Sequence, residues 1–394
     1  MRLALNRIDR VGVVVALIAA YGLWSPFALA RANRIVPGEP RSLLEALPSS
    51  YGIVLLAIAV AGIVIALLRL PIVVRLVASL IVLAALTVLI GSSAAFLTPE
   101  GNTYARVSPA SGFWMLSAAF ALLATDSLAR LRPAPSLRLV FLVLTIGAVA
   151  LLLTSGVWSG LSIMKEYGSR AETFWSEAGR HLMLALGSLV AAVVVGLPLG
   201  ILCHRVEPLR SAILNVLNII QTIPSIALFG ILIGPLAWVA ATVPGAAELG
   251  IRGIGTAPAF VALFLYSLLP MVANTVGGLA GVSSDANDAA RGVGMTDRQR
   301  LFQVELPLAF PVILTGIRIV LVQNIGLATI AALIGGGGFG VFVFQGLGQT
   351  AMDLVLLGAV PTVALAFAAA VILDAVVEMI APAGSSSRRK EASP

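Results

Sequence analysis

The sequence predicts an all-α polytopic membrane protein with about ten transmembrane helices. Of its 394 residues, 59% are hydrophobic and 11% are charged, and the mean hydropathy is +1.04. Soluble domains carry about 25% charged residues, so this chain has too little polar surface to cover a water-soluble globule. Its apolar residues also gather in long runs, most of them near the ~20 residues that a helix needs to cross ~30 Å of hydrocarbon.

The composition also argues against several other classes. A net charge of +7 does not require a nucleic acid partner, because Arg and Lys accumulate on the inner side of membrane proteins. Cys203 is the single cysteine, which excludes an intrachain disulfide, and His181 and His204 are too few to form a metal site alone. The sequence contains no GxxxxGK[ST] motif, no Ser/His/Asp set and no paired catalytic carboxylates at a useful spacing. We therefore expect a non-catalytic chain without a cofactor of its own.

Ten apolar segments are expected to cross the membrane, and in chain order they are 11–29, 52–68, 72–92, 113–129, 139–157, 181–203, 211–238, 256–281, 309–334 and 354–380. The first resembles a signal peptide with a cleavage site at ALARA, but its apolar run is long for one, so we expect it to remain as a span. Arg75 is near one end of the third segment, where its side chain is expected to snorkel to the headgroups. Prolines interrupt several later spans, and such breaks either line a pathway or act as packing kinks.

The distribution of basic residues predicts the orientation. With the N-terminus inside and alternating spans, sixteen Lys and Arg residues lie inside and eight lie outside, while Arg318 is within a span. This imbalance follows the positive-inside rule. It places both termini, the tail 382–394 and the polar segment 285–311 in the cytoplasm.

That polar segment, DANDAARGVGMTDRQRLFQVELPLAFP, is predicted to be ordered. Ser284 and Asp285 are candidate N-caps of a first helix, and Gly294 has the position that favours glycine after a helix end. Thr296 and Gln299 form a T-x-x-Q capping box that opens a second short helix. A helix, a glycine turn and a helix with a small apolar face suit docking into a groove on another protein. The alternative is an interfacial helix that rests on lipid headgroups.

The same segment resembles the EAA loop of ABC-importer permeases, which has E-A-A, three residues, a glycine, nine residues and I-x-L-P. This chain reads Asp288-Ala289-Ala290, then Gly294, then Val304-Glu305-Leu306-Pro307, with both spacings kept. Asp288 replaces the family's Glu and Val304 replaces its Ile. Aspartate is one methylene shorter, so a contact that Glu makes to the ATPase is weakened or replaced here.

The stretches NIIQTIPSIALFGILIGPL (218–236), PAFVALFLYSLLPMVANTVGGLAGV (258–282) and ALIGGGGFG (332–340) extend the resemblance. Together they are similar to permeases of the osmoprotectant group, which import glycine betaine, carnitine and choline across the bacterial inner membrane. We expect a permease core at 179–381 with the family's five-helix type I fold, including a cytoplasmic coupling loop at 283–307. Residues 1–178 form an additional region of about five spans, and its role does not follow from the sequence.

The resemblance implies the partners and the mechanism. Two permease subunits, the second being the same or a related chain, would work with a cytoplasmic dimer of ABC ATPases, which bind ATP and Mg²⁺, and with an external solute-binding protein. ATP-driven closure of the ATPases would switch the permease pair between inward-open and outward-open states. The residues implied in this coupling are Asp288, Ala289, Ala290, Gly294, Glu305, Leu306 and Pro307.

Polar and aromatic groups inside the core spans are candidates for the translocation pathway, and they are Gln221, Thr222, Pro224, Tyr266, Asn274, Gln323 and Asn324. The alternative for each is an interhelical hydrogen bond or core packing. Arg318 is expected to form an ion pair with Asp374 or Glu378, because an unpaired charge in hydrocarbon is costly; snorkelling is the alternative.

Other functions remain open from the residues alone. These are import of another small polar solute of amino-acid type by the same ATP-driven mechanism, transport driven by an ion gradient, a membrane enzyme, or a scaffold that only recruits the ATPase. The scarcity of acidic residues in the middle of the spans argues against coupling to a proton or sodium gradient.

Overall fold

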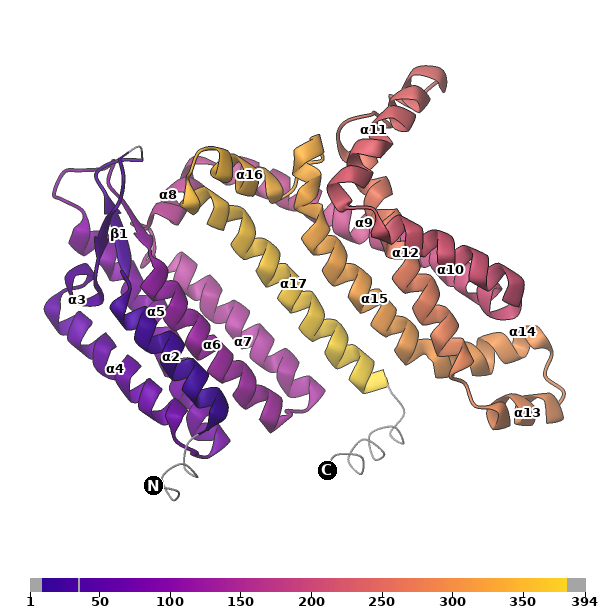
Figure 1. Ribbon diagram of the computed structural model, residues 1–394, viewed down its shortest axis with the longest axis horizontal. Coiled ribbons are helices and arrows are strands. Elements are labelled where there is room, and N and C mark those ends of the chain that lie inside the picture. The colour runs from indigo at the N-terminus through magenta and orange to yellow at the C-terminus, as the bar shows by residue number, and fades with distance from the viewer. Residues whose placement is uncertain (1–8, 35, 381–394) are drawn as a thin grey trace. The chain divides into compact units, whose positions relative to one another are not determined.

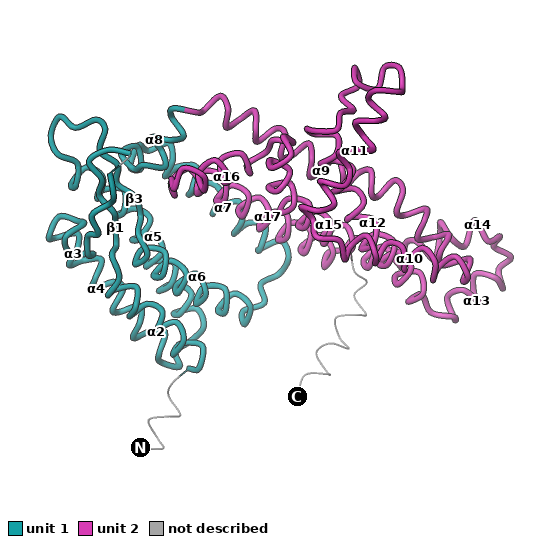
Figure 2. Tube along the Cα trace, turned by 45° about the horizontal axis from the view of Figure 1, so that its top comes forward, with its two compact units in different colours: residues 1–169 teal, residues 170–394 magenta. Residues whose placement is uncertain are grey.

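The computed structural model describes residues 9–34 and 36–380, and most of this part of the chain is helical (Figure 1). Among the described residues, nine helices are long and apolar enough to cross a membrane, and α2, Arg10–Trp24, is a shorter apolar helix of 15 residues. The predicted helical membrane fold is therefore confirmed. The chain divides into two compact units, residues 1–169 and 170–394 (Figure 2). The tail predicted at 382–394 lies outside the described residues.

Unit 1 contains five apolar helices, namely α2, α4 (Ser49–Leu67), α5 (Ile72–Leu97), α6 (Ser111–Leu131) and α7 (Pro135–Thr154). Glycine allows the first four to pack closely. A Cβ atom on Gly12 of α2 would lie 1.8 Å from the carbonyl oxygen of Ala66 in α4, and one on Gly62 of α4 would lie 2.7 Å from the ring of Phe120 in α6. Helices in a bilayer associate by van der Waals contact, so small residues at these crossings stabilise the bundle.

A small sheet closes one end of unit 1. Strands β1 (Ala28–Arg31), β2 (Glu39–Arg41) and β3 (Arg106–Pro109) form an antiparallel sheet in the order β2-β1-β3, next to the short helices α3 (Leu43–Ala46) and α8 (Ser162–Ser169). The strands come from the connections that follow α2 and α5. No strand was predicted here, because three or four residues per strand are too few to give a periodic signal.

A buried ion cluster joins the helices at the other end of unit 1. The guanidinium of Arg75 at the start of α5 lies 3.0 Å from the carboxylate of Asp9 and 3.9 Å from that of Asp126. Arg130 reaches Asp9 at 3.2 Å and Asp126 at 3.0 Å. Arg75 is 2% exposed, so the prediction that it snorkels is wrong. It is instead neutralised inside the unit, which removes the cost of a bare charge near hydrocarbon.

Unit 2 contains the helices α9 (Ala171–Arg205), α10 (Glu207–Thr222), α11 (Ser225–Thr242), α12 (Thr256–Ala280), α13 (Ser284–Gly292), α14 (Asp297–Arg300), α15 (Leu306–Ala328), α16 (Gly340–Gly348) and α17 (Met352–Ile380). A π-helix, η1 (Leu301–Glu305), precedes α15, and a 3-10 helix, η2 (Ile330–Ile334), follows it. The centre of the unit is a bundle of α9, α12 and α15. These helices contribute Leu189, Met271 and Ile313 respectively to one buried apolar cluster.

The predicted span 211–238 is wrong in its extent. Residues 211–238 were expected to form one membrane-spanning segment, but they belong to two helices, α10 and α11, separated at Ile223 and Pro224. Proline disfavours helical backbone in the residue before it, and Ile223 accordingly has an extended ψ of 127°. Only α11 has the length and hydropathy of a span. The continuous apolar character of the stretch concealed the break.

Candidate functional site

Residues 283–307, here called the elbow, form an ordered connection between α12 and α15 (Figure 1). Helix α13 begins after Ser283, whose hydroxyl accepts a hydrogen bond from the amide of Ala286, so the N-cap lies one residue before the predicted candidates. Its end matches the prediction. Gly294 has a φ of +82°, and the amide of Met295 reaches back to the carbonyl of Ala290 at 3.1 Å. This left-handed turn closes the first arm of the elbow.

The second arm begins with the predicted capping box. The hydroxyl of Thr296 accepts from the amide of Gln299, while the side chain of Gln299 accepts from the amide of Thr296 at 2.9 Å. Helix α14 then continues through η1 into α15 without a break. Pro307 has no amide hydrogen, and its ring conflicts with the carbonyl four residues earlier, which favours the wider π turn directly before it.

Glu305 fixes the elbow to the bundle. Its carboxylate lies 2.6 Å from the guanidinium of Arg205 at the end of α9 and 2.9 Å from that of Arg300 in α14. Glu305 is 3% exposed and Arg300 is 5% exposed, whereas Asp297, the other partner of Arg300, is on the surface. The sequence pattern named Glu305, but it gave no sign of Arg205, which is a hundred positions away along the chain.

The outer surface of the elbow combines small, acidic and apolar residues. Asp288, Ala289 and Gly294 are exposed, while Ala290 is buried against the rest of the elbow. Two larger apolar side chains of the elbow are also exposed, Val293 at 75% and Phe302 at 58%. Phe302 was not among the contact residues predicted from the sequence, although an aromatic residue within the polar run 296–303 was the available signal. Val293 and Phe302 are exposed apolar side chains of the elbow that a docked partner would bury.

Asn324 is fully buried and links three helices. Its side-chain amide donates to the hydroxyl of Ser188 in α9 and to that of Ser267 in α12, each at 2.9 Å. Because its side chain is buried and bonded to α9 and α12, Asn324 holds these helices to α15 in this conformation. This geometry corresponds to the alternative of an interhelical hydrogen bond.

Tyr266, Gln221 and Gln323 meet at a single backbone carbonyl. Pro270 removes the amide that would bond to the carbonyl of Tyr266 within α12. The side-chain amide of Gln221 in α10 donates to this oxygen at 3.0 Å, and that of Gln323 in α15 approaches it at 3.5 Å. The hydroxyl of Tyr266 donates in turn to the carbonyl of Ile223, at the break between α10 and α11. The structure thus brings together three of the candidate pathway residues.

The other candidate pathway residues lie apart from this group. The side chains of Thr222 and Asn274 hydrogen-bond within their own helices, to the carbonyls of Ile219 and Pro270 respectively. Pro224 is exposed and precedes α11 as its N-cap. None of these contacts assigns the three residues to a pathway.

Arg318 in α15 forms an ion pair with Asp374 in α17. Both side chains are partly exposed, at 34% and 48% respectively, so the pair lies at the edge of the bundle. Of the two partners that the sequence analysis considered, the structure selects Asp374. The pair joins the middle of α15 to the C-terminal part of α17.

Replacing Asp374 with Asn is expected to destabilise the chain by about 2–3 kcal/mol, the cost of a lone basic residue inside a membrane helix. The thermal unfolding of the purified chain in a lipid nanodisc measures this loss. Reversing both charges, with Arg318→Asp and Asp374→Arg together, should restore at least half of it. An Asp374→Asn variant as stable as the parent would show that Arg318 reaches the headgroups instead.

A glycine-rich turn follows η2 at the opposite end of α15 from the elbow. Gly335, Gly337 and Gly338 all have positive φ. The amide of Gly338 donates to the buried carboxylate of Glu177 in α9 at 2.6 Å, and the ring of His181 is fully buried beside Phe339. A Cβ on Gly337 would lie 2.7 Å from the carboxylate of Glu177. Glycine is therefore required for this close approach.

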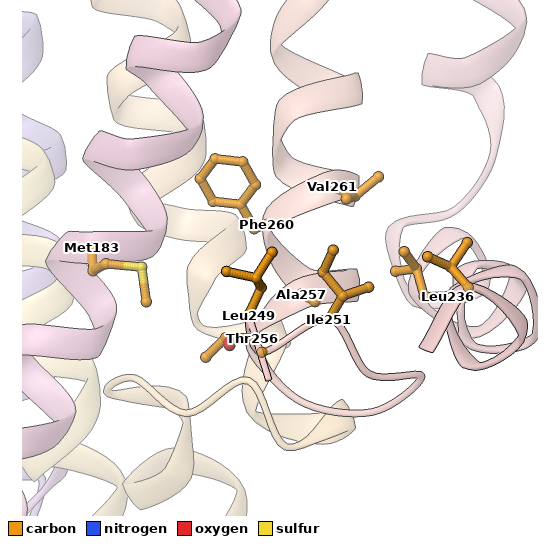
Figure 3. A pocket seen from close by; sticks show the side chains of 10 residues that line it. Met183, Leu236, Leu249, Ile251, Thr256, Ala257, Phe260 and Val261 are labelled. Carbon is orange, nitrogen blue, oxygen red and sulfur yellow. The ribbon is translucent and has the colours of Figure 1, made fainter. Parts of the chain in front are cut away.

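Figure 3 shows an apolar pocket of about 330 Å³ between α9, α11 and α12. Its lining includes Met183, Leu236, Leu249, Ile251 and Phe260. It contains none of the predicted pathway residues and offers little polar surface. The pocket therefore does not identify a substrate site.

Comparison with known proteins supplies the family. Residues 9–164 match the family described as "ABC transporter permease YehY, N-terminal domain", and residues 192–384 match the "Binding-protein-dependent transport system inner membrane component" family. The chain is 38% identical over 213 residues to the choline transport system permease protein OpuBB of Bacillus subtilis, a match that covers 54% of this chain and 90% of that protein. It is also 38% identical over 205 residues to the osmoprotectant import permease protein OsmW of Salmonella typhimurium, covering 52% and 90%.

Among solved structures, the MetNI methionine ABC transporter in an inward-facing conformation is similar, with 22% identity and a TM-score of 0.47 over 54% of this chain and 96% of that chain. The sequence relatives match along most of their own length, and the two family matches lie in the two different units. The chain therefore belongs to the inner-membrane permease components of binding-protein-dependent ABC transporters, and it carries in addition an N-terminal domain of the YehY type.

Proposed function

We propose that this chain is the membrane-spanning subunit of an ATP-driven importer for osmoprotectants, with glycine betaine, carnitine, choline and related quaternary ammonium compounds as the substrate class. The similarity to permeases whose names specify choline and osmoprotectants supports the substrate class. The elbow supports the ATP-driven mechanism, because a rigid exposed segment anchored to the bundle can transmit movement from a partner to the spans. That anchored elbow is the single observation that carries the proposal.

In this proposal the elbow lies in the cytoplasm and docks on a partner ATPase, which binds the ATP and Mg²⁺. Asp288, Ala289 and Gly294 form the contact surface, with Val293 and Phe302 as its apolar anchors. Apolar side chains that become desolvated in a groove contribute most of the binding energy of an interface. Leu306 and Pro307, together with Glu305, transmit the movement into α15. An external solute-binding protein selects the substrate, for which aromatic rings suit quaternary ammonium groups.

The assembly that we propose contains two permease chains and two ATPases in the bacterial inner membrane, with both termini of this chain on the cytoplasmic side. Gln221, Tyr266 and Gln323 are its proposed pathway residues, because they meet where the end of α10 contacts α12 and α15. Asn324 is proposed as a structural residue beside them.

Reconstitution tests this function. The chain, its ATPase and the solute-binding protein are placed in liposomes, and uptake of labelled glycine betaine, carnitine and choline is measured with and without internal ATP. The proposal expects uptake that requires both ATP and the binding protein, together with ATP hydrolysis that rises when the loaded binding protein is added. Uptake by the chain alone, driven by an ion gradient, would contradict it. A preference for amino acids would keep the mechanism and change the substrate class.

Replacing Phe302 with Ser is expected to weaken binding of the ATPase by about 30-fold, which corresponds to ~2 kcal/mol for an interface anchor. Stability should change little, because Phe302 is 58% exposed in the isolated chain. Binding of the ATPase to the chain in nanodiscs measures the effect. Tyr104→Ser, which removes a 77% exposed aromatic ring in unit 1, is the control and should bind normally. Equal binding by both variants would remove Phe302 from the interface.

A further inference from the structure

The carbonyl of Tyr266 has two candidate donors on two different helices, and this arrangement differs from the other polar contacts of the bundle. Gln221 of α10 is at 3.0 Å, a normal hydrogen bond, whereas Gln323 of α15 is at 3.5 Å, the outer limit of one. Within α12 the usual donor to this oxygen, the amide four residues further on, is missing because Pro270 lacks an amide hydrogen. A backbone carbonyl without a donor is costly in a bilayer, where water is not available to replace it.

The helices that supply the two donors are held very differently. Helix α15 belongs to the central bundle, and the residue after Gln323 is Asn324, which is fully buried and bonded to both α9 and α12. Residues 207–242, here called the arm, comprise α10 and α11. Among the described residues, α10 buries only Leu217, and α11 buries only Leu228 and Phe229. Three further apolar residues of α10, Ile213, Leu214 and Ile220, pack partly buried against α9 and α12. The arm therefore contacts the bundle but has fewer fully buried residues, and such a segment opens at a lower free energy than the bundle.

The break between α10 and α11 provides a hinge for the arm. Ile223 is extended, and its carbonyl accepts the hydroxyl of Tyr266. Tyr266 therefore contacts the arm at two atoms, its backbone oxygen through Gln221 and its hydroxyl through Ile223. Both contacts lie at this hinge within the arm, so α10 and α11 can change direction there when the bond of Gln221 breaks.

We propose that Gln221 and Gln323 are paired positioning residues that exchange the Tyr266 carbonyl as the arm moves against the α9–α12–α15 bundle. In the conformation described here Gln221 holds the oxygen. When the arm swings away, a shift of about half an ångström brings the amide of Gln323 to a normal distance of ~3.0 Å, so the carbonyl stays bonded in both states. The exchange makes the arm a two-state element of the transport cycle, and in that respect it rests on the proposed ATP-driven function.

The first test uses the full chain in nanodiscs and does not depend on an ATPase. Gln221→Leu, Gln323→Leu and the double variant are compared by thermal unfolding. Each single variant keeps one donor, so each should lower the unfolding temperature slightly, while the double variant should lower it by at least twice the sum of the single effects. Asn215→Leu removes an exposed amide from the same helix and is the matched control. If the double variant lowers the unfolding temperature only by the sum of the two single effects, the proposed exchange is refuted.

The second test measures movement in the assembled transporter. Spin labels are placed at Ile219 on α10 and Ile319 on α15 in a Cys203→Ala background, with one labelled permease per complex, since both positions are exposed and Cys203 is the single cysteine of the chain. The distance between the labels should change by several ångströms between nucleotide-free and ATP-trapped states. A reference pair at Val190 on α9 and Ile319 should keep its distance. An unchanged α10–α15 distance, in a transporter that hydrolyses ATP, would refute the moving arm.

Coupling provides a readout that a purely structural role would not alter. Gln221→Leu should favour one arm position, so ATP hydrolysis continues while the amount of solute imported per ATP falls several-fold. Unaltered coupling would contradict the inference even if stability changed. If the chain binds no ATPase at all, the proposed function fails, whereas the unfolding comparison still decides whether the two glutamines share the carbonyl.

Discussion

ATP-driven uptake is expected to fall more than 100-fold when Glu305 is replaced by Ala, to the background of empty liposomes. The Glu305 carboxylate is 3% exposed and is held between Arg205 at 2.6 Å and Arg300 at 2.9 Å. Without it, the buried guanidinium of Arg300 keeps only the exposed carboxylate of Asp297. Removing one partner of a buried ion pair costs about 3–5 kcal/mol, because the remaining charge is left uncompensated. The elbow then loses its connection to the end of α9, so movement at its surface no longer reaches the bundle.

The variant is examined by uptake, by ATPase binding and by thermal unfolding of the chain in nanodiscs. Binding should decrease less than uptake, since the contact residues of the elbow are unchanged and only its attachment is lost. Asp297→Asn is the control: its carboxylate also pairs with Arg300 but is 86% exposed, so the change is worth less than ~1 kcal/mol. Uptake within twofold of the parent in Glu305→Ala would show that the elbow transmits force by another route.

Local chemistry explains why the elbow could be predicted from the sequence. Its turn and its second helix depend on residues within six positions of each other, namely Gly294, Thr296 and Gln299. Capping and glycine turns are set by such short-range contacts, so their geometry follows from the order of residues. The position of the first N-cap, Ser283 instead of its neighbours, shows the usual uncertainty of one residue at helix ends.

Contacts between distant parts of the chain could not be predicted in this way. Arg205 meets Glu305 only because α9 and α15 pack side by side, and nothing near Arg205 marks it as a partner. The same limit applies to Arg75, which was expected to snorkel because a single sequence does not reveal Asp9 as its buried partner. A charge at the end of an apolar run can reach water or find a counter-ion, and only the packing decides between them.

The hinge of the arm could be predicted from the sequence only in part. Pro224 and the polar residues before it were visible in the sequence, but the high hydropathy of 211–238 favoured a single span. The structure separates α10 from α11 and uses the side chain of Tyr266 to cover the carbonyl of Ile223. Breaks inside a membrane require such side-chain donors, so a proline near Gln and Tyr residues is a better indicator of a hinge than hydropathy.

In unit 1, replacing Arg75 with Met is expected to destabilise the fold by about 3–5 kcal/mol, since it leaves Asp9 and Asp126 with the partly exposed Arg130 alone. For a unit of this size that corresponds to a fall of about 10 °C in unfolding temperature. Arg10→Met, which removes an exposed charge at the start of α2, is the control and should change it little. Limited proteolysis should cut the Arg75 variant first within residues 9–169, and cleavage confined to unit 2 would contradict the prediction.

The pH dependence of unit 1 gives an independent check on this ion cluster. Burial favours the protonated form of Asp9, but the amide of Gly12 and the guanidinium groups of Arg75 and Arg130 outweigh it and lower the pKa of the carboxyl from 3.8 to about 2. Because Asp9 has a lower pKa in the folded state than in the unfolded state, its ionisation stabilises the fold at pH values above the unfolded-state pKa of 3.8. This stabilisation is lost as the pH falls through the folded-state pKa of about 2. The stability that unit 1 gains from the cluster should therefore be constant from pH 8 to pH 5. If the difference in stability between the parent and Arg75→Met disappears within that pH range, Asp9 is not held as an anion by Arg75.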